Sequence, residues 1–305
     1  MKIPPSLYSL LAVCCLLTSC ATVRQQAYYV SPFNGHPSDY HPVPLTVDTA
    51  HTAVYIHAAF LNGSANQQRT DGVTAFRSSL SVAHHTGIFQ AYYGGDFTIG
   101  AYKMGRWDTG ATYLPVRVSL PPANAAFLNG KRGPKTFGGV GFDAGANLVW
   151  PVGRCEWRYL GVETSMHQEF GDYLSIRKNL PDSAAALLIR NPFFATLGFS
   201  TEIVKRTSYG EFGFRIATGW ALGDAYQNSG VYDNESSKYL HYGYGSFSFH
   251  VTAERYTAYI QFNGATQARS LHLGVHYRLT RLRLPAWEHG RFHKRDPIQG
   301  PAIWR

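Results

Sequence analysis

Three side chains that could carry acyl-transfer chemistry stand at alternate positions, Ser165, His167 and Glu169. A serine, a histidine and a carboxylate are the nucleophile, base and orienting acid of a hydrolytic site. Residues two apart on a strand are separated by about 6.5 to 7 Å, whereas a nucleophile and its base must approach to roughly 3 Å. The three are therefore weak catalytic candidates, which require side chains that lean together.

Metal and cofactor chemistry find less support. His84 and His85 are adjacent, and the sequence has neither a His-Glu-x-x-His motif nor paired cysteines at metal-ligand spacing. The glycines of 138–141 lie inside a strand pattern rather than between a strand and a helix, so they do not predict a phosphate site. We expect no metal ion and no cofactor.

The stretch from Phe137 to Phe170, which positions the triad candidates, alternates too regularly to be anything but a membrane-type strand pair. Apolar residues take the even positions from 140 to 150, and small or polar residues take the odd positions from 139 to 147. A turn predicted at 151–156 reverses the chain, and the alternation resumes. Each arm has roughly the 9 to 11 residues that a tilted strand needs to cross hydrocarbon. A polar face opposite an apolar face is typical of a transmembrane barrel strand.

The same period of two predicts ten strands along the chain. We expect them near residues 53–60, 73–84, 89–99, 137–150, 157–170, 193–203, 211–220, 244–251, 256–263 and 271–280. A soluble sandwich also alternates, but its strands average about 5 to 6 residues. The predicted fold class is all-β, a closed antiparallel transmembrane β-barrel of about 10 strands, with roughly 8 to 12 as the range.

The links between these strands alternate in length. The links after strands two, four, six and eight are short, at 85–87, 151–156, 206–208 and 253–255. Those after strands one, three, five and seven are long. The link after strand three could hold a hairpin or strand pair at 111–120, and the link after strand five could hold a short helix at 182–190. Bacterial barrels have short periplasmic turns and long extracellular loops, so this parity predicts both chain ends at the periplasmic face.

Residues on the polar faces of the strands would line the lumen. Carboxylates and guanidinium groups in a narrow lumen should pair, because an isolated buried charge is costly. The predicted lumen-lining residues are Arg77, Tyr92, Asp96, Asp143, Asn147, Glu163, His167, Glu202, Glu211, Arg215, Tyr259, His272, His276 and Arg278.

Composition agrees with a barrel and disfavours a nucleic-acid partner. Charged residues make up only 15% of the 305 residues, where about 25% is usual. The net charge is +9, yet the basic residues are scattered and no known nucleic-acid-binding motif accompanies them. An anionic lipid surface accounts for the same charge.

The N-terminus has the form of a secretory signal. Lys2 precedes an apolar stretch at 7–17, and Leu17-Thr18-Ser19-Cys20 resembles the lipobox of bacterial lipoproteins. That resemblance implies removal of residues 1–20 and lipidation of Cys20. The alternative is an ordinary signal peptide that is cut near Ala21.

Residues 53–280 resemble the outer-membrane β-barrels of the porin-like superfamily. The resemblance implies a bacterial outer-membrane location with both termini periplasmic, and membrane lipids and lipopolysaccharide as partners. Members usually end on an aromatic residue of the last strand, whereas a basic tail follows here. The predicted organisation is a signal at 1–20, a periplasmic tether at 21–50, a barrel at 51–283 and a basic tail at 284–305.

A ten-strand barrel is only slightly wider than the eight-strand type, whose side chains fill its interior. The leading interpretation is a polar, largely plugged lumen with a structural or ligand-binding role. A narrow pore for small solutes is the alternative, and a lipid-modifying hydrolase is the third. Outer-membrane lipid hydrolases place Ser, His and an acid on barrel strands, but the order Ser-x-His reverses the His-x-Ser of lipid A deacylases. The sequence does not predict an oligomeric state.

Overall fold

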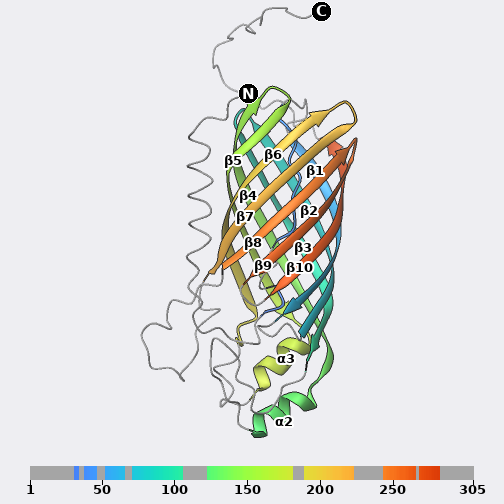
Figure 1. Ribbon diagram of the computed structural model, residues 1–305, viewed down its shortest axis with the longest axis vertical. Coiled ribbons are helices and arrows are strands. Elements are labelled where there is room, and N and C mark those ends of the chain that lie inside the picture. The colour runs from blue at the N-terminus through green and yellow to red at the C-terminus, as the bar shows by residue number, and fades with distance from the viewer. Residues whose placement is uncertain are drawn as a thin grey trace, which may run out of the picture.

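The computed structural model describes residues 31–33, 38–46, 52–65, 71–105, 122–180, 189–222, 243–265 and 268–281. Ten strands close into an antiparallel barrel in which sequence neighbours pair and β1 pairs with β10 (Figure 1). Their bounds are β1 Thr52–Ala65, β2 Asp71–Thr86, β3 Phe89–Met104, β4 Gly133–Val152, β5 Cys155–Phe170, β6 Phe193–Thr207, β7 Gly210–Leu222, β8 Gly243–Ala253, β9 Tyr256–Ala265 and β10 Arg269–Arg281. The prediction of a closed antiparallel barrel of about ten strands is confirmed.

The alternation along each strand separates an apolar exterior from a polar interior. Large apolar side chains are exposed on the outside of every strand, among them Ile56, Phe76, Phe97, Phe142, Val162, Phe199, Ile216, Phe247, Phe262 and Leu273. Charged and polar side chains are buried on the inside. This arrangement is the reverse of a soluble protein and suits a barrel that is surrounded by lipid.

The turns at one end of the barrel are tighter than predicted. Two-residue turns at 87–88, 153–154, 208–209 and 254–255 join the strands. The predicted turn at 151–156 is corrected, because β4 and β5 stay paired as far as Val152 and Cys155. Gly153 has a φ of 62°, the left-handed conformation that a two-residue hairpin turn needs. We call this end of the barrel the turn end.

Two helices of the described part of the chain lie at the opposite end, which we call the loop end (Figure 1). They are α2 at Pro122–Gly130 and α3 at Asp172–Asn179, and neither was predicted. The helix predicted at 182–190 and the hairpin predicted at 111–120 lie largely or wholly outside the described residues. Among the described residues, no helix is both long enough and apolar enough to span a membrane.

The main departure from prediction is an N-terminal segment inside the barrel. Residues 31–33 and 38–46, which we call the luminal segment, are buried except for the partly buried Thr46. Phe33 contacts Phe137 near the loop end, and Thr46 contacts Glu156 near the turn end. The segment thus follows the barrel interior for most of its length (Figure 1).

The tether predicted at 21–50 is corrected by this placement for its described residues, whereas both chain ends, which are predicted to be periplasmic, lie outside the described residues. Residues 31–33 and 38–46 are not part of a tether below the barrel, because their polar groups bond to the inner wall. The first described residue, Ser31, lies at the loop end, whereas β10 ends at Arg281 beside Ala53, at the turn end. The two ends of the described chain therefore lie at opposite ends of the barrel.

Candidate functional site

The buried carboxylate of Asp39 ties the luminal segment to three strands. It lies 3.6 Å from Arg77 Nη1 and 4.0 Å from His57 Nε2, and it is hydrogen-bonded to His272 Nδ1. These partners belong to β2, β1 and β10. A buried charge is tolerated only when it is paired and hydrogen-bonded, so this position requires the basic wall that surrounds it.

Tyr40 makes the second side-chain attachment. Its hydroxyl donates a hydrogen bond of 3.0 Å to Glu202 Oε1, and its ring stacks on His250 with 4.4 Å between centroids. Glu202 also accepts hydrogen bonds from Arg158 at 2.6 Å and from His250 at 2.8 Å, if that ring nitrogen carries the proton. Four buried side chains thus form one network between the segment and strands β5, β6 and β8.

Wall side chains also satisfy the backbone of the luminal segment. Gln261 donates to the Ser38 carbonyl at 2.9 Å, Arg158 to the Val43 carbonyl at 2.9 Å, and Gln90 to the Pro44 carbonyl at 3.1 Å. The Thr46 amide donates to Glu156 at 2.8 Å. Buried backbone groups must find partners, and here wall side chains take the place of a β-ladder.

Phe33 anchors the segment near the loop end. Its ring stacks on His167, with centroids 4.5 Å apart and an interplanar angle of 3°, and the Arg77 guanidinium lies 5.7 Å from its centroid. The site for this ring exists because residue 139 is glycine. A Cβ on Gly139 would lie 2.4 Å from the Phe33 ring, a distance that would force the ring to move.

Helix α3 covers part of the loop end. Arg177 pairs with Glu169 and donates a 2.9 Å hydrogen bond to the Ile189 carbonyl. Tyr173 stacks on Tyr102 at 3.9 Å, and burial raises the pKa of the Tyr173 hydroxyl above its ordinary value. A buried ion pair with further hydrogen bonds, next to stacked rings, fixes the helix over the interior.

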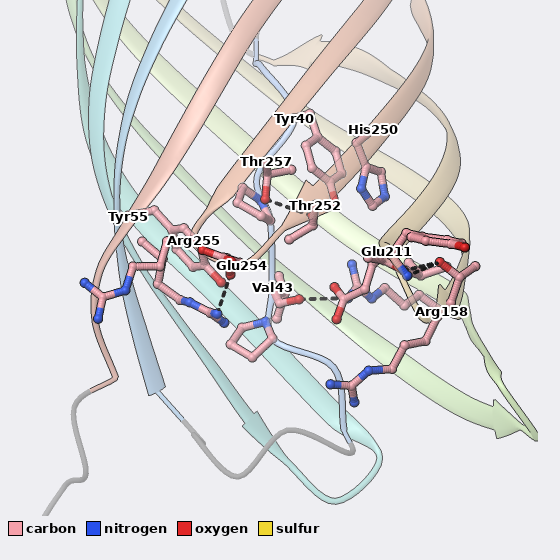
Figure 2. A pocket seen from close by; sticks show the side chains of 18 of the residues that line it. Tyr40, Val43, Tyr55, Arg158, Glu211, His250, Thr252, Glu254, Arg255 and Thr257 are labelled. Atoms are coloured by element: carbon pink, nitrogen blue, oxygen red, sulfur yellow. Dashed lines mark hydrogen bonds between the residues drawn. The ribbon is translucent and has the colours of Figure 1, made fainter.

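The turn end holds a cavity of about 290 Å³ between the luminal segment and the wall (Figure 2). Tyr40 and Val43 of the segment face it, together with Tyr55, His250 and Thr257 of the strands. Four of its lining residues are arginines and two are glutamates: Arg158, Arg206, Arg255, Arg278, Glu211 and Glu254. The cavity is therefore net basic.

The structure places the three triad candidates on the inner face of β5 with different partners. Ser165 Oγ lies 2.8 Å from Thr196 Oγ1, and His167 Nδ1 lies 3.6 Å from Asp96 Oδ2. Glu169 pairs with Arg177 of α3. The acid that would orient the base is thus bound to an arginine, and the Phe33 ring covers the histidine.

Most of the predicted lumen-lining residues are buried on the inner face. These are Arg77, Tyr92, Asp96, Asp143, Asn147, Glu163, His167, Glu202, Arg215, Tyr259, His272 and His276. Glu211 and Arg278 are only partly buried and line the cavity at the turn end. Arg215 pairs with Glu163, and Arg77 with Asp96 at 3.8 Å, which is the pairing that a narrow lumen requires.

Sequence reasoning missed Arg158, Asp39, Tyr40 and His41. Arg158 was missed because the pairing of β5 with β6 shifts register between Arg158 and Gly161, and such a bulge changes which residues face inward. The other three lie in a segment without periodicity. Their signal is composition alone, an Asp-Tyr-His run between proline-rich stretches.

Three described side chains could hold a metal ion together. One potential ligand atom from each of Asp96, Asp143 and His167 lies within 4.8 Å of the others. The three come from β3, β4 and β5, and are therefore neighbours across strands rather than along the sequence. No local spacing motif could have revealed them.

No family model matches the chain, and no curated protein matches it. Several solved structures are similar in fold. The β domain of the Bordetella autotransporter BrkA is 9% identical, with 75% of this chain and 99% of that chain covered and a TM-score of 0.41. An outer-membrane channel from Pseudomonas putida F1 is 10% identical, with 79% and 98% covered and a TM-score of 0.35. The translocator domain of the autotransporter NalP from Neisseria meningitidis is 14% identical, with 77% and 90% covered and a TM-score of 0.34.

These neighbours are outer-membrane barrels, and likenesses this weak carry no argument about activity. The apolar belt and the polar interior carry the physical argument instead. A closed barrel satisfies every strand hydrogen bond internally, and its apolar exterior is what lipid requires. The chain therefore has the architecture of a transmembrane β-barrel.

Proposed function

We propose that this protein is an outer-membrane β-barrel whose own N-terminal segment plugs the lumen, and that its role is structural or ligand-binding. The observation that carries this proposal is the luminal segment. Side chains of β1, β2, β3, β5, β6, β9 and β10 contact it through hydrogen bonds or ion pairs. A segment attached around most of the wall closes the passage rather than lining it.

Planar-bilayer recording separates this proposal from the narrow-pore alternative. The full chain should give no discrete conductance steps, because Asp39 and Tyr40 hold the segment across the lumen. A variant that lacks residues 31–46 should conduct if its barrel folds. Stable single-channel steps from the full chain would favour the pore and overturn the plug.

The cavity at the turn end supports the ligand-binding form of the role. With arginines in excess of carboxylates, it favours a small ligand that carries a carboxylate or phosphate group. Arg255→Ala should weaken the binding of such an anion, whereas Lys131→Ala, at the loop end, should not. Equal binding by the two variants would exclude this cavity as the site.

Membrane lipids and lipopolysaccharide are the partners we propose for the apolar exterior, with the loop end extracellular. Labelling of intact cells tests the orientation, in a chain whose free thiol is removed by Cys155→Ser. Arg132→Cys at the loop end should react with a membrane-impermeant maleimide, and Tyr209→Cys at the turn end should react only after cell lysis. The reverse pattern would invert the topology.

We further propose that Cys20 carries the lipid and that this lipid enters the leaflet at the loop side. Eleven positions separate Cys20 from Ser31, a span of at most about 40 Å. For the lipid to enter the leaflet at the turn side instead, this stretch would have to pass through the filled lumen or through hydrocarbon, where irregular backbone is excluded. Mass spectrometry of the N-terminal peptide should show a lipid that Cys20→Ser abolishes, and a peptide that begins at Ala21 would contradict lipidation.

A further inference from the structure

We propose that the inner wall carries a binding site for a divalent transition metal of the zinc class, with Asp96, Asp143 and His167 as ligands. All three are at least nine-tenths buried and face the lumen. The site does not depend on the proposed plug function, because its ligands belong to the barrel wall. Nothing in the spacing of the sequence predicted it.

The distances suit shared coordination better than direct hydrogen bonding. Asp96 Oδ2 and His167 Nδ1 lie 3.6 Å apart, beyond a normal hydrogen bond. Nitrogen and oxygen ligands bind zinc at about 2.0 to 2.2 Å, so two of them in a tetrahedral site lie roughly 3.3 to 3.6 Å apart. The ligand atom of Asp143 lies within 4.8 Å of those of Asp96 and His167. Small rotations of the three side chains would therefore complete a three-ligand set.

Neighbouring polar atoms provide a second observation. Asp96 Oδ2 and Asp143 Oδ1 have no hydrogen-bond partner among the described residues. Nor do the two ring nitrogens of His41, a side chain of the luminal segment that is 6% exposed. His41 Nε2 lies 3.4 Å from Asp143 Oδ2, again the spacing of two ligands of one ion. Buried polar atoms in this state need an explanation, and a metal ion satisfies them together.

The residue between the ligands leaves room for an ion. Gly141 of β4 pairs with Asp96 on one side and with His167 on the other. A Cβ at this position would lie 2.1 Å from Asp96 Oδ2 and 2.3 Å from His167 Nδ1. Asp96 Oδ2 and His167 Nδ1 thus approach each other above Gly141, which has no side chain that would separate them.

The local charge also favours a cation. Asp39, Asp96 and Asp143 are buried in this region, and Arg77 is the guanidinium that contacts Asp39 and Asp96. Three carboxylates and one guanidinium together carry a formal charge of −2, which a divalent ion would balance. Imidazole with carboxylate ligands suits zinc and its neighbours in the transition series, whereas calcium and magnesium prefer oxygen ligands alone.

Metal binding by the full chain in detergent tests the site. After treatment with EDTA, reloading with ZnCl₂ and desalting, the protein should retain about one zinc ion per chain. Asp143→Asn and Gly141→Ala should each weaken zinc binding by at least about tenfold. Gly141→Ala removes no ligand and displaces only side-chain ends, so its barrel should still fold. Cobalt, as a spectroscopic substitute, should give visible absorption bands that both variants lose.

Two matched variants control for unspecific effects. Gly95→Ala adds the same methyl group on the neighbouring strand, where its nearest contact would be the Gly141 carbonyl oxygen at an ordinary 3.7 Å. His84→Gln removes a histidine at the turn end that contacts Thr52 instead. Both should bind zinc like the parent. The site would be overturned if the parent chain retained no zinc, or if Asp143→Asn retained as much zinc as the parent. The zinc content of the parent chain decides the test even if a variant fails to fold.

Discussion

Loss of the Tyr40 hydroxyl should measurably loosen the luminal segment from the wall. Tyr40→Phe deletes the 3.0 Å hydrogen bond to Glu202 and keeps the ring that stacks on His250. Glu202 retains Arg158 at 2.6 Å and His250 at 2.8 Å, so its charge stays paired. The loss is therefore that of one buried hydrogen bond to a charged group, about 1.5 to 3 kcal/mol in the free energy of unfolding.

Urea unfolding in lipid vesicles provides the assay for this loss. With an m-value of about 3 kcal/mol/M, the midpoint should fall by roughly 0.5 to 1 M. Tyr209→Phe is the matched control, because this tyrosine at the turn end is 90% exposed. A double-mutant cycle with Glu202→Gln should return a coupling energy of about 1 kcal/mol or more. Equal midpoints for Tyr40→Phe and Tyr209→Phe would refute the attachment.

Three further perturbations test the ring site, the loop-end helix and the exterior. Gly139→Ala should cost about 1 to 3 kcal/mol of unfolding free energy, because its methyl group would displace the Phe33 ring. Arg177→Ala should expose α3 to proteolysis, because it leaves Glu169 buried without its partner, at a local cost of about 3 to 5 kcal/mol. Phe247→Arg should cost about 2 to 4 kcal/mol in vesicles, because it moves a charge into the apolar belt.

Each of these variants has a control elsewhere in the chain. Gly72→Ala should be nearly neutral, because its Cβ would meet only ordinary contacts at 3.8 Å. Lys178→Ala changes the same turn of α3 and should leave proteolysis unchanged. Tyr209→Arg adds a charge at an exposed turn and should cost little. If a variant and its control behaved alike, the contact assigned to that variant would have no energetic role.

Strand alternation was sufficient to predict the barrel wall, because lipid outside and polar groups inside impose opposite demands on successive residues. The pair Phe247 and Ser248 shows this, with the ring exposed and the hydroxyl buried. Turn lengths were less predictable. The alternation weakens near Pro151, yet backbone pairing continues to Val152, where Gly153 allows the tight reversal.

The contents of the lumen could not be predicted from local pattern. Asp39 meets His272 across 233 positions of sequence, and Tyr40 meets Glu202 across 162. Such contacts depend on barrel closure, which no window of the sequence describes. The luminal segment has the local sequence pattern of a polar, proline-rich linker. That pattern is the same whether such a segment lies outside the barrel or fills the lumen.

The accessibility of a wall serine tests the central claim most directly. In a Cys155→Ser background, Ser165→Cys places a thiol on the inner wall where the serine is 1% exposed, and Ser208→Cys places one at an exposed turn. In folded barrels we predict that a water-soluble maleimide labels position 208 quickly and position 165 hardly at all. Deletion of residues 31–46 should speed labelling at 165. Labelling at 165 as fast as at 208 in the full chain would show a lumen open to water and contradict the account.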